Sequence, residues 1–152
     1  MIALACDHGG FELMKEVRHH LDSIGENYKD FGTYSTESCD YPVVTEVAAK
    51  AIIDGECKLG IFICGTGIGM SIAANKIPGI RAGLCTTEYM AEMTRSHNDA
   101  NVLVLGGRVI NKELAINIVD TFLKTDFTND ERHCRRISML SELDSKRKDA
   151  VV

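Results

Sequence analysis

The stretch Leu59-Gly60-Ile61-Phe62-Ile63-Cys64-Gly65-Thr66-Gly67-Ile68-Gly69 joins an unbroken apolar run to a glycine-rich loop. A continuous apolar run of this length is typical of a strand buried on both faces of a parallel sheet. Similar runs occupy residues 2–6, 80–85 and 102–105, and residues 28–31 form a weaker one. We therefore expect a Rossmann-like parallel sheet of about five strands.

Segments with helical periodicity separate these runs. Apolar residues recur at helical spacing within 11–24, 44–52 and 114–122, and further helices are expected over about 68–75, 88–96 and 131–143. Residues 32–42 are polar and are expected to form a loop. Alternating strands and helices predict an α/β protein, a single-domain three-layer α/β/α sandwich spanning residues 1–152. The C-terminal helix, about 131–148, is expected to reach a partner subunit, and its charged end at 146–149 is expected to fray.

Composition excludes several classes of protein. The chain has 152 residues and a formal net charge of −5, which disfavours general nucleic-acid binding. Its apolar runs are too short to cross a membrane, and the N-terminus lacks the basic segment of a signal peptide. The six cysteines form no Cys-x-x-Cys pair, so we expect reduced thiols in the cytoplasm and no metal site.

The loop after the central strand is the first candidate for chemistry. Three glycines within residues 65–69 let backbone N–H groups approach an anion such as a phosphate or an enediolate. Cys64 begins this loop, and a thiol near a helix N-terminus can act as a base or a nucleophile. The competing interpretation is a tight strand–helix turn with an inert buried thiol. Because carboxyl ends of parallel strands share one edge, Asp7, His8 and the turn after Leu105 should lie beside this loop.

Two histidines and two arginines complete the candidates. His8 follows the first strand and His97 precedes the last one, and imidazole titrates near neutral pH. Arg132 and Arg136 are four residues apart, which places them on one helix face, where guanidinium groups suit phosphate oxygens. On spacing alone these two arginines are better explained as a charged helix surface paired with nearby acids.

Seven segments together carry a resemblance. They are Cys-Asp-His-Gly-Gly at 6–10, Asp-Tyr-Pro at 40–42, Cys-Gly-Thr-Gly-Ile-Gly-Met-Ser-Ile-Ala-Ala-Asn-Lys at 64–76, Ile-Arg-Ala at 80–82, His-Asn-Asp-Ala-Asn-Val-Leu at 97–103, Gly-Gly-Arg at 106–108 and Arg-His-Cys-Arg-Arg at 132–136. In this order and spacing the set resembles the type B ribose-5-phosphate isomerase family, which also includes the galactose-6-phosphate isomerase subunits. The resemblance spans nearly the whole chain.

The resemblance implies a metal-free, cofactor-free isomerase of small sugar phosphates, with homodimers or dimer pairs whose active sites draw residues from two chains. Cys64 would be the base that moves a proton between C2 and C1, and His97 the acid that opens the furanose ring. Thr66 would help to hold the enediolate. The implied substrate-binding residues are Asp7, His8, Tyr41, Gly65, Gly67, Ile68, Gly69, Asn98, Arg108, Arg132 and Arg136.

Three alternatives stay open at this point. Some family members replace the cysteine by a carboxylate a few residues on, but this chain has Cys64 and carries Asn75 at the end of the motif. The substrate could be a six-carbon sugar phosphate, allose 6-phosphate or galactose 6-phosphate, although the pair His97-Asn98 favours ribose 5-phosphate over the galactose branch. The chain could also be a non-catalytic sugar-phosphate-binding or nucleotide-binding module, or a hydrolase or redox enzyme that uses Cys64.

Overall fold

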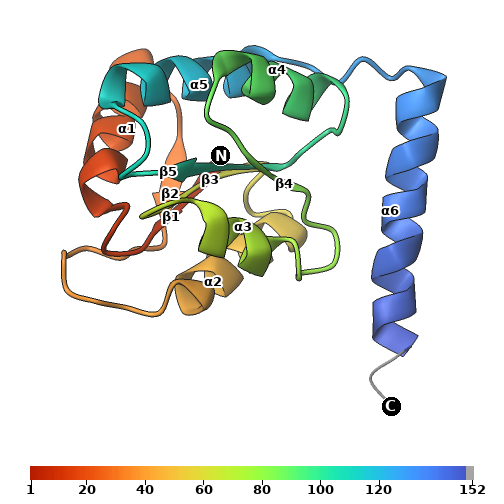
Figure 1. Cartoon of the computed structure of the whole chain (residues 1–152), viewed down its shortest axis with the longest axis horizontal. Coiled ribbons are helices and arrows are strands. Elements are labelled where there is room, and N and C mark those ends of the chain that lie inside the picture. Colours follow the sequence, from red (N-terminus) through yellow and green to blue (C-terminus); the bar gives the residue numbers. More distant parts are fainter. Residues whose placement is uncertain (150–152) are drawn as a thin grey trace.

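The computed structural model describes residues 1–149 as a five-stranded parallel sheet with helices on both faces (Figure 1). The strands lie in the order β2-β1-β3-β5-β4. Their bounds are β1 Ile2–Cys6, β2 Tyr28–Asp30, β3 Leu59–Cys64, β4 Ala82–Leu84 and β5 Val102–Gly106. The helices are α1 Phe11–Ile24, α2 Tyr41–Ile53, α3 Ile68–Ala74, α4 Glu88–Ser96, α5 Lys112–Lys124 and α6 Glu131–Asp149. The expected three-layer architecture is confirmed.

Alternating side chains of the central strands build two cores. One core lies under α1, α4 and α5, and receives Leu4, Ile61 and Leu103 from the sheet. The other lies under α2 and α3, and receives Ala5 and Phe62. Because successive side chains of a strand point to opposite faces, a strand buried on both sides must be apolar throughout. This explains why β1, β3 and β5 appear in the sequence as continuous apolar runs.

Three boundaries differ from the sequence-based expectation. β4 is shorter than residues 80–85, because the Arg81 N–H is bonded to the Asn101 side chain at 2.8 Å and not to a neighbouring strand. α2 begins at Tyr41, inside the expected loop, since Pro42 is tolerated in the first helical turn. The last helix continues past residue 143 to Asp149, close to the expected bound of about 148.

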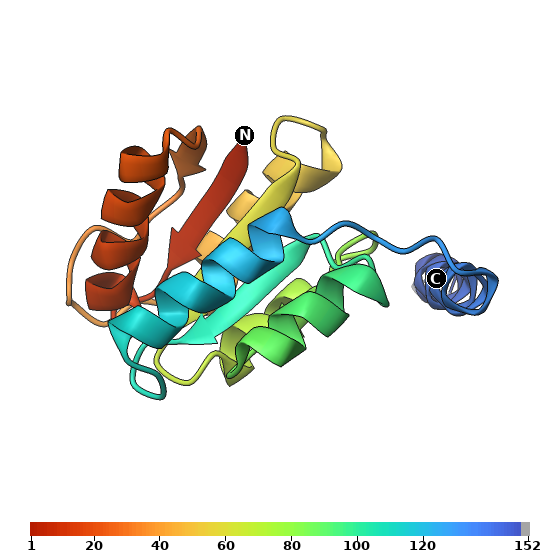
Figure 2. The same cartoon turned by 90° about the horizontal axis from the view of Figure 1, so that it is seen from above.

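Helix α6 extends beyond the end of the sheet (Figures 1 and 2), and its Asp144 carboxylate accepts the Gly79 N–H at 2.8 Å. Its 19 residues correspond to about 28 Å of helix. Met139, Leu140 and Leu143 on this helix are exposed, although they are apolar. Within residues 1–149, no helix combines the length and apolar character needed to span a membrane.

Candidate active site

Three turns interlock at the carboxyl edge of the sheet, as the strand pattern predicted. The Gly107 N–H donates to the Cys64 carbonyl at 2.8 Å, and the Arg108 N–H donates to the Gly65 carbonyl at 2.9 Å. A Cβ atom at Gly9 would lie 2.9 Å from the Cα of Gly65, so only glycine fits where the turns after β1 and β3 touch. The turns after β1 and β5 are therefore both held against the loop that begins at Cys64.

Cys64 is buried at the end of β3, with 4% of its surface exposed. Its Sγ accepts the Gly67 N–H at 3.2 Å, and the Thr66 hydroxyl oxygen accepts the Ile68 N–H at 3.3 Å. Gly67 has a left-handed φ of 80°, which is what allows the loop to direct this N–H at the sulfur. The loop thus directs two N–H donors at its own Cys64 and Thr66 side chains.

A second thiol, Cys6, ends the neighbouring strand β1. Burial, together with the charge of Asp30, raises the pKa of Cys6 to about 12, although a backbone hydrogen bond with Thr33 opposes the shift. Cys6 therefore stays protonated near neutral pH and is unsuited to act as a base. Cys6 and Cys64 end the neighbouring strands β1 and β3, but only Cys64 leads into the glycine-rich loop.

Asp7 and His8 follow β1 beside this loop. One carboxylate oxygen of Asp7 accepts the Gly9 and Gly10 N–H groups at 2.8 and 3.0 Å, which shapes the turn. The His8 Nδ1 accepts the Cys39 N–H at 3.3 Å. Because Nδ1 acts as an acceptor, a neutral His8 carries its proton on Nε2, where it can donate to a ligand.

Tyr41 and Arg108 border opposite ends of the same loop. A Cβ atom at Gly69 would lie 2.7 Å from the Tyr41 ring, and one at Gly65 would lie 3.3 Å from a guanidinium nitrogen of Arg108. The lack of a side chain at Gly65 and Gly69 thus makes room for an aromatic ring and a cation. The structure brings together a first group of predicted residues: Asp7, His8, Tyr41, Cys64, Gly65, Thr66, Gly67, Ile68, Gly69 and Arg108.

His97 and Asn98 are not part of this first group. They follow α4 and precede β5, so they lie at the amino edge of the sheet. The pairing of β3 with β5 sets Gly60 opposite Val102 and Cys64 opposite Gly106. The amino and carboxyl edges of the sheet are therefore four residues of strand apart, which corresponds to about 13 Å at the usual rise of a β-strand. Figure 2 shows α6 beyond one end of the sheet and the turn after β5 at the other.

His133, which sequence reasoning left without a role, packs directly on His97. The two rings are stacked, with centroids 4.3 Å apart and planes at 15°. Burial, followed by the charges of His97 and Arg132, lowers the pKa of His133, so this ring is neutral near pH 7. Among residues 1–149 its Nε2 has no hydrogen-bond partner, since Asp130 lies 3.8 Å away.

Arg132 and Arg136 are exposed on the first turns of α6, beside His133. Within the described residues neither arginine forms a salt bridge with Asp130 or Glu131, contrary to the surface-pairing interpretation. His97, Asn98, Arg132 and Arg136 thus form a second group, at and beyond the amino edge of the sheet.

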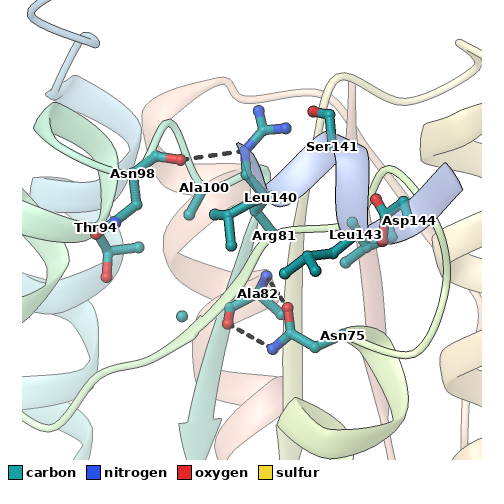
Figure 3. Close-up of a pocket in the computed structure, with 12 residues that line it drawn as sticks. Asn75, Arg81, Ala82, Thr94, Asn98, Ala100, Leu140, Ser141, Leu143 and Asp144 are labelled. Carbon is teal, nitrogen blue, oxygen red and sulfur yellow. Dashed lines mark hydrogen bonds between the residues drawn. The ribbon is translucent and has the colours of Figure 1, made fainter. Parts of the chain in front are cut away.

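A cleft of about 340 Å³ separates α6 from the body of the molecule (Figure 3). Leu140, Leu143 and Asp144 of α6 face Asn98 and Arg81 across it. The cleft borders the second group and not the Cys64 loop. Asn75 also lines this cleft, and its side-chain amide bonds to both the N–H and the carbonyl of Ala82 at 2.9 Å. Asn75 therefore ties α3 to β4.

Fold and site define a class: a parallel α/β protein with a glycine-rich loop at one edge of its sheet and titratable side chains at both edges. The model of the Ribose/Galactose Isomerase family matches residues 2–140. Ribose-5-phosphate isomerase B of Escherichia coli is 45% identical over 146 residues, which is 96% of this chain and 97% of the relative. The chain belongs to the ribose/galactose isomerase family.

Solved structures agree with this assignment. Ribose-5-phosphate isomerase B of Clostridium thermocellum is 50% identical and superimposes with a TM-score of 0.94, covering 96% of this chain and 98% of that one. The type B ribose 5-phosphate isomerase of Trypanosoma brucei is 40% identical, with a TM-score of 0.88 over 93% of this chain and 97% of that one. Both likenesses extend over nearly the whole length of each chain.

Proposed function

We propose that this protein interconverts ribose 5-phosphate and ribulose 5-phosphate through an enediolate, in an active site shared by two copies of the chain. One observation carries the proposal: a thiol in a donor-lined loop, with Arg108 and His8 beside it, stands at one edge of the sheet, while a histidine and two arginines stand at the other. Each edge holds half of what a sugar-phosphate isomerase needs. Likeness to proteins named ribose-5-phosphate isomerase supports the same substrate.

In the proposed reaction Cys64, as the thiolate, removes the proton from C2 of the open-chain aldose. The electrons move into the C1 carbonyl and form an enediolate. The proton of the C2 hydroxyl passes to the oxygen on C1, Cys64 returns its proton to C1, and C2 becomes the ketone, so no net proton or electron is gained. Backbone donors of Gly65–Gly69 and the Thr66 hydroxyl would stabilise the developing oxyanion, where one donor is worth about 3–4 kcal/mol.

The other half of the site would open the ring and hold the phosphate. His97 would donate a proton to the ring oxygen as the bond to C1 breaks, and Asn98 would contact the sugar. A positioned acid or base of this kind contributes about 10²–10⁴-fold. Asp7 and Tyr41 would line the sugar site. The groups proposed for the phosphate are His8, Arg108, Arg132 and Arg136.

A homodimer would bring the two halves together, and a tetramer would do so as a pair of dimers. Two exposed apolar surfaces support this assembly. Met139, Leu140 and Leu143 are exposed on α6, and Val47, Ile68 and Ile72 are exposed on α2 and α3 next to the glycine loop. Clustered aliphatic side chains of this kind mark protein interfaces. We propose that α6 of one copy packs against a second copy, so that its arginines reach that copy's Cys64 loop.

The proposal is tested by activity on ribose 5-phosphate, with Cys64→Ser as the variant and Cys6→Ser as the matched control. We expect about 10²–10⁴-fold loss of kcat in Cys64→Ser and near wild-type activity in Cys6→Ser, because serine keeps the donor to the Thr33 carbonyl. Activity unchanged by a chelator would support the metal-free mechanism. Full activity in Cys64→Ser, or higher kcat/KM on allose 6-phosphate or galactose 6-phosphate, would contradict the assignment.

We propose that all six cysteines, which are free in the structure, are kept as reduced thiols in the cytoplasm. A free thiol at position 64 is also what the proposed proton transfer requires, since a sulfur held in a disulfide cannot act as a base.

A further inference from the structure

The turn that presents His97 and Asn98 is built around Asp99. Helix α4 ends with the Ala100 N–H bonded to the Thr94 carbonyl and the Asp99 N–H bonded to the Arg95 carbonyl, both at 3.1 Å. These two bonds close a turn around a residue in the left-handed conformation, which glycine adopts most readily. Asp99 occupies that position with a φ of 44°. A residue with a side chain is thus retained where glycine would be less strained.

The Asp99 carboxylate lies between two arginines. One oxygen is 3.0 Å from an Arg81 Nη, and the other is 3.0 Å from an Arg95 Nη. Arg81 comes from the segment before β4 and Arg95 from within α4. Asp99 therefore joins two parts of the chain that hold the turn from either side.

The same two arginines also fix the backbone of the turn. Arg81 Nε donates to the Asn98 carbonyl at 3.1 Å (Figure 3) and to the Asp99 carbonyl at 2.9 Å. Arg95 donates to the Ala100 carbonyl at 2.7 Å. Three successive carbonyls of the turn are thus bonded to guanidinium groups. Charge-assisted bonds of this type are stronger and more directional than neutral ones.

Arg95 anchors this arrangement in the core. Its side chain is 13% exposed, and its guanidinium lies 5.6 Å from the ring centroid of the buried Phe122. Arg95 Nε also donates to the Thr125 carbonyl at 3.3 Å, in the segment that leads to α6. The turn is therefore held against α5 as well as α4.

We infer that Asp99, clamped by Arg81 and Arg95, is a positioning residue that fixes the orientation of His97 and Asn98 toward the substrate. The inference rests on the proposed function of those two residues. Displacing a catalytic group by about 1 Å can lower the reaction rate about 100-fold. Hydrogen bonds that restrain three consecutive peptide units therefore have a direct use in catalysis. None of the three clamp residues needs to touch the substrate itself.

The decisive variant is Asp99→Gly, because glycine relieves the left-handed strain and removes the clamp at the same time. If Asp99 served only to end α4, this variant would be as active as wild type and at least as stable. A positioning role predicts at least about a tenfold loss of kcat on ribose 5-phosphate. Asp99→Asn, which tolerates the same backbone and keeps one acceptor oxygen, should recover part of that loss. Asp54→Asn, which removes an exposed i,i+4 pair with Lys50 at the end of α2, is the matched control.

A second measurement separates positioning from general damage. Ribulose 5-phosphate has no free 5-hydroxyl and is open-chain, so exchange of its C1 proton with D₂O requires Cys64 and the glycine loop but no ring chemistry. We expect Asp99→Gly to retain this exchange within about twofold while conversion of ribose 5-phosphate falls at least about tenfold. Unchanged conversion, or an equal fall of both reactions, would overturn the inference. Absence of both reactions in the wild-type protein would overturn the proposed function as well.

Discussion

The imidazole of His133 stacks on that of His97, with ring centroids 4.3 Å apart. His133 belongs to the first turn of α6 and His97 to the end of α4, so this pair joins the separate helix to the body of the molecule. The neutral state of His133 permits the stack, because two protonated rings at this distance would repel each other. The stack thus links the orientation of the proposed acid to the position of α6.

Replacing His133 should change how stability depends on pH. Its pKa is lowered in the folded chain, whereas the unfolded chain takes up the proton near the ordinary value of about 6.5. Above that pH its contribution is constant, and as pH falls below it the unfolded state binds more protons and stability declines. His133→Phe keeps a ring on His97 but cannot titrate. We expect its melting temperature to fall less than that of wild type between pH 7.5 and 5.5. An equal fall in both proteins would contradict this prediction.

Complementation between two inactive variants tests whether the active site is shared. In a mixed dimer of Cys64→Ala and His97→Asn, one site carries both changes and the other carries neither. Random pairing of equal amounts should therefore restore about a quarter of wild-type activity. Sites contained within one chain would give no recovery. The measurement is activity after co-expression, with separately purified and unmixed variants as the control.

Charge placed on the apolar side of α6 should prevent assembly without unfolding the chain. Leu140 and Leu143 are 45% and 55% exposed, so Leu140→Asp combined with Leu143→Asp costs little in a single chain. At an interface the same charges would be buried and unpaired. We expect a smaller mass by light scattering, an unchanged circular dichroism spectrum and loss of activity. Glu142→Gln, on the same helix, is the control and should retain both assembly and activity.

Gly67 should tolerate no side chain. Its φ is 80°, and a Cβ atom would contact Leu84 and lie 3.0 Å from the carbonyl carbon of Leu105. Gly67→Ala should cost roughly 1–3 kcal/mol in the free energy of unfolding, and should move the N–H that donates to Cys64. Gly55 has the same φ, but a Cβ atom there would have no neighbour within 4 Å, so Gly55→Ala isolates the backbone strain. We expect the control to lose about 1 kcal/mol in stability and to keep its activity.

Sequence reasoning predicted the first group of site residues because parallel strands are easy to recognise and their carboxyl ends must coincide. Cys64 and the turn after β5 follow from that rule alone. The distance of His97 from Cys64 follows from the same rule, since a residue just before β5 must lie at the other edge of the sheet. The role of Tyr41 depended on family resemblance, because its contact with Gly69 is set by how α2 packs on α3.

The position of α6 could not be predicted in the same way. Ile137, Leu140 and Leu143 have the spacing of a helix that packs on something, and this spacing is the same whether the surface belongs to its own chain or to another. The burial of His133 was also unpredictable, because it depends on the segment before α6. That segment returns to the end of α4, where the Thr128 N–H donates to the Ser96 carbonyl at 3.1 Å.

The separation of Cys64 and His97, which lie at opposite edges of the sheet, has a kinetic consequence. If the active site is divided between two chains, as proposed, an isolated chain would have neither a complete set of catalytic groups nor a complete phosphate site. Turnover per chain would then depend on enzyme concentration and decline on dilution below the dissociation constant of the dimer. Substrate that bridges both chains would oppose this decline, since it binds the assembled form and shifts the equilibrium toward it by mass action.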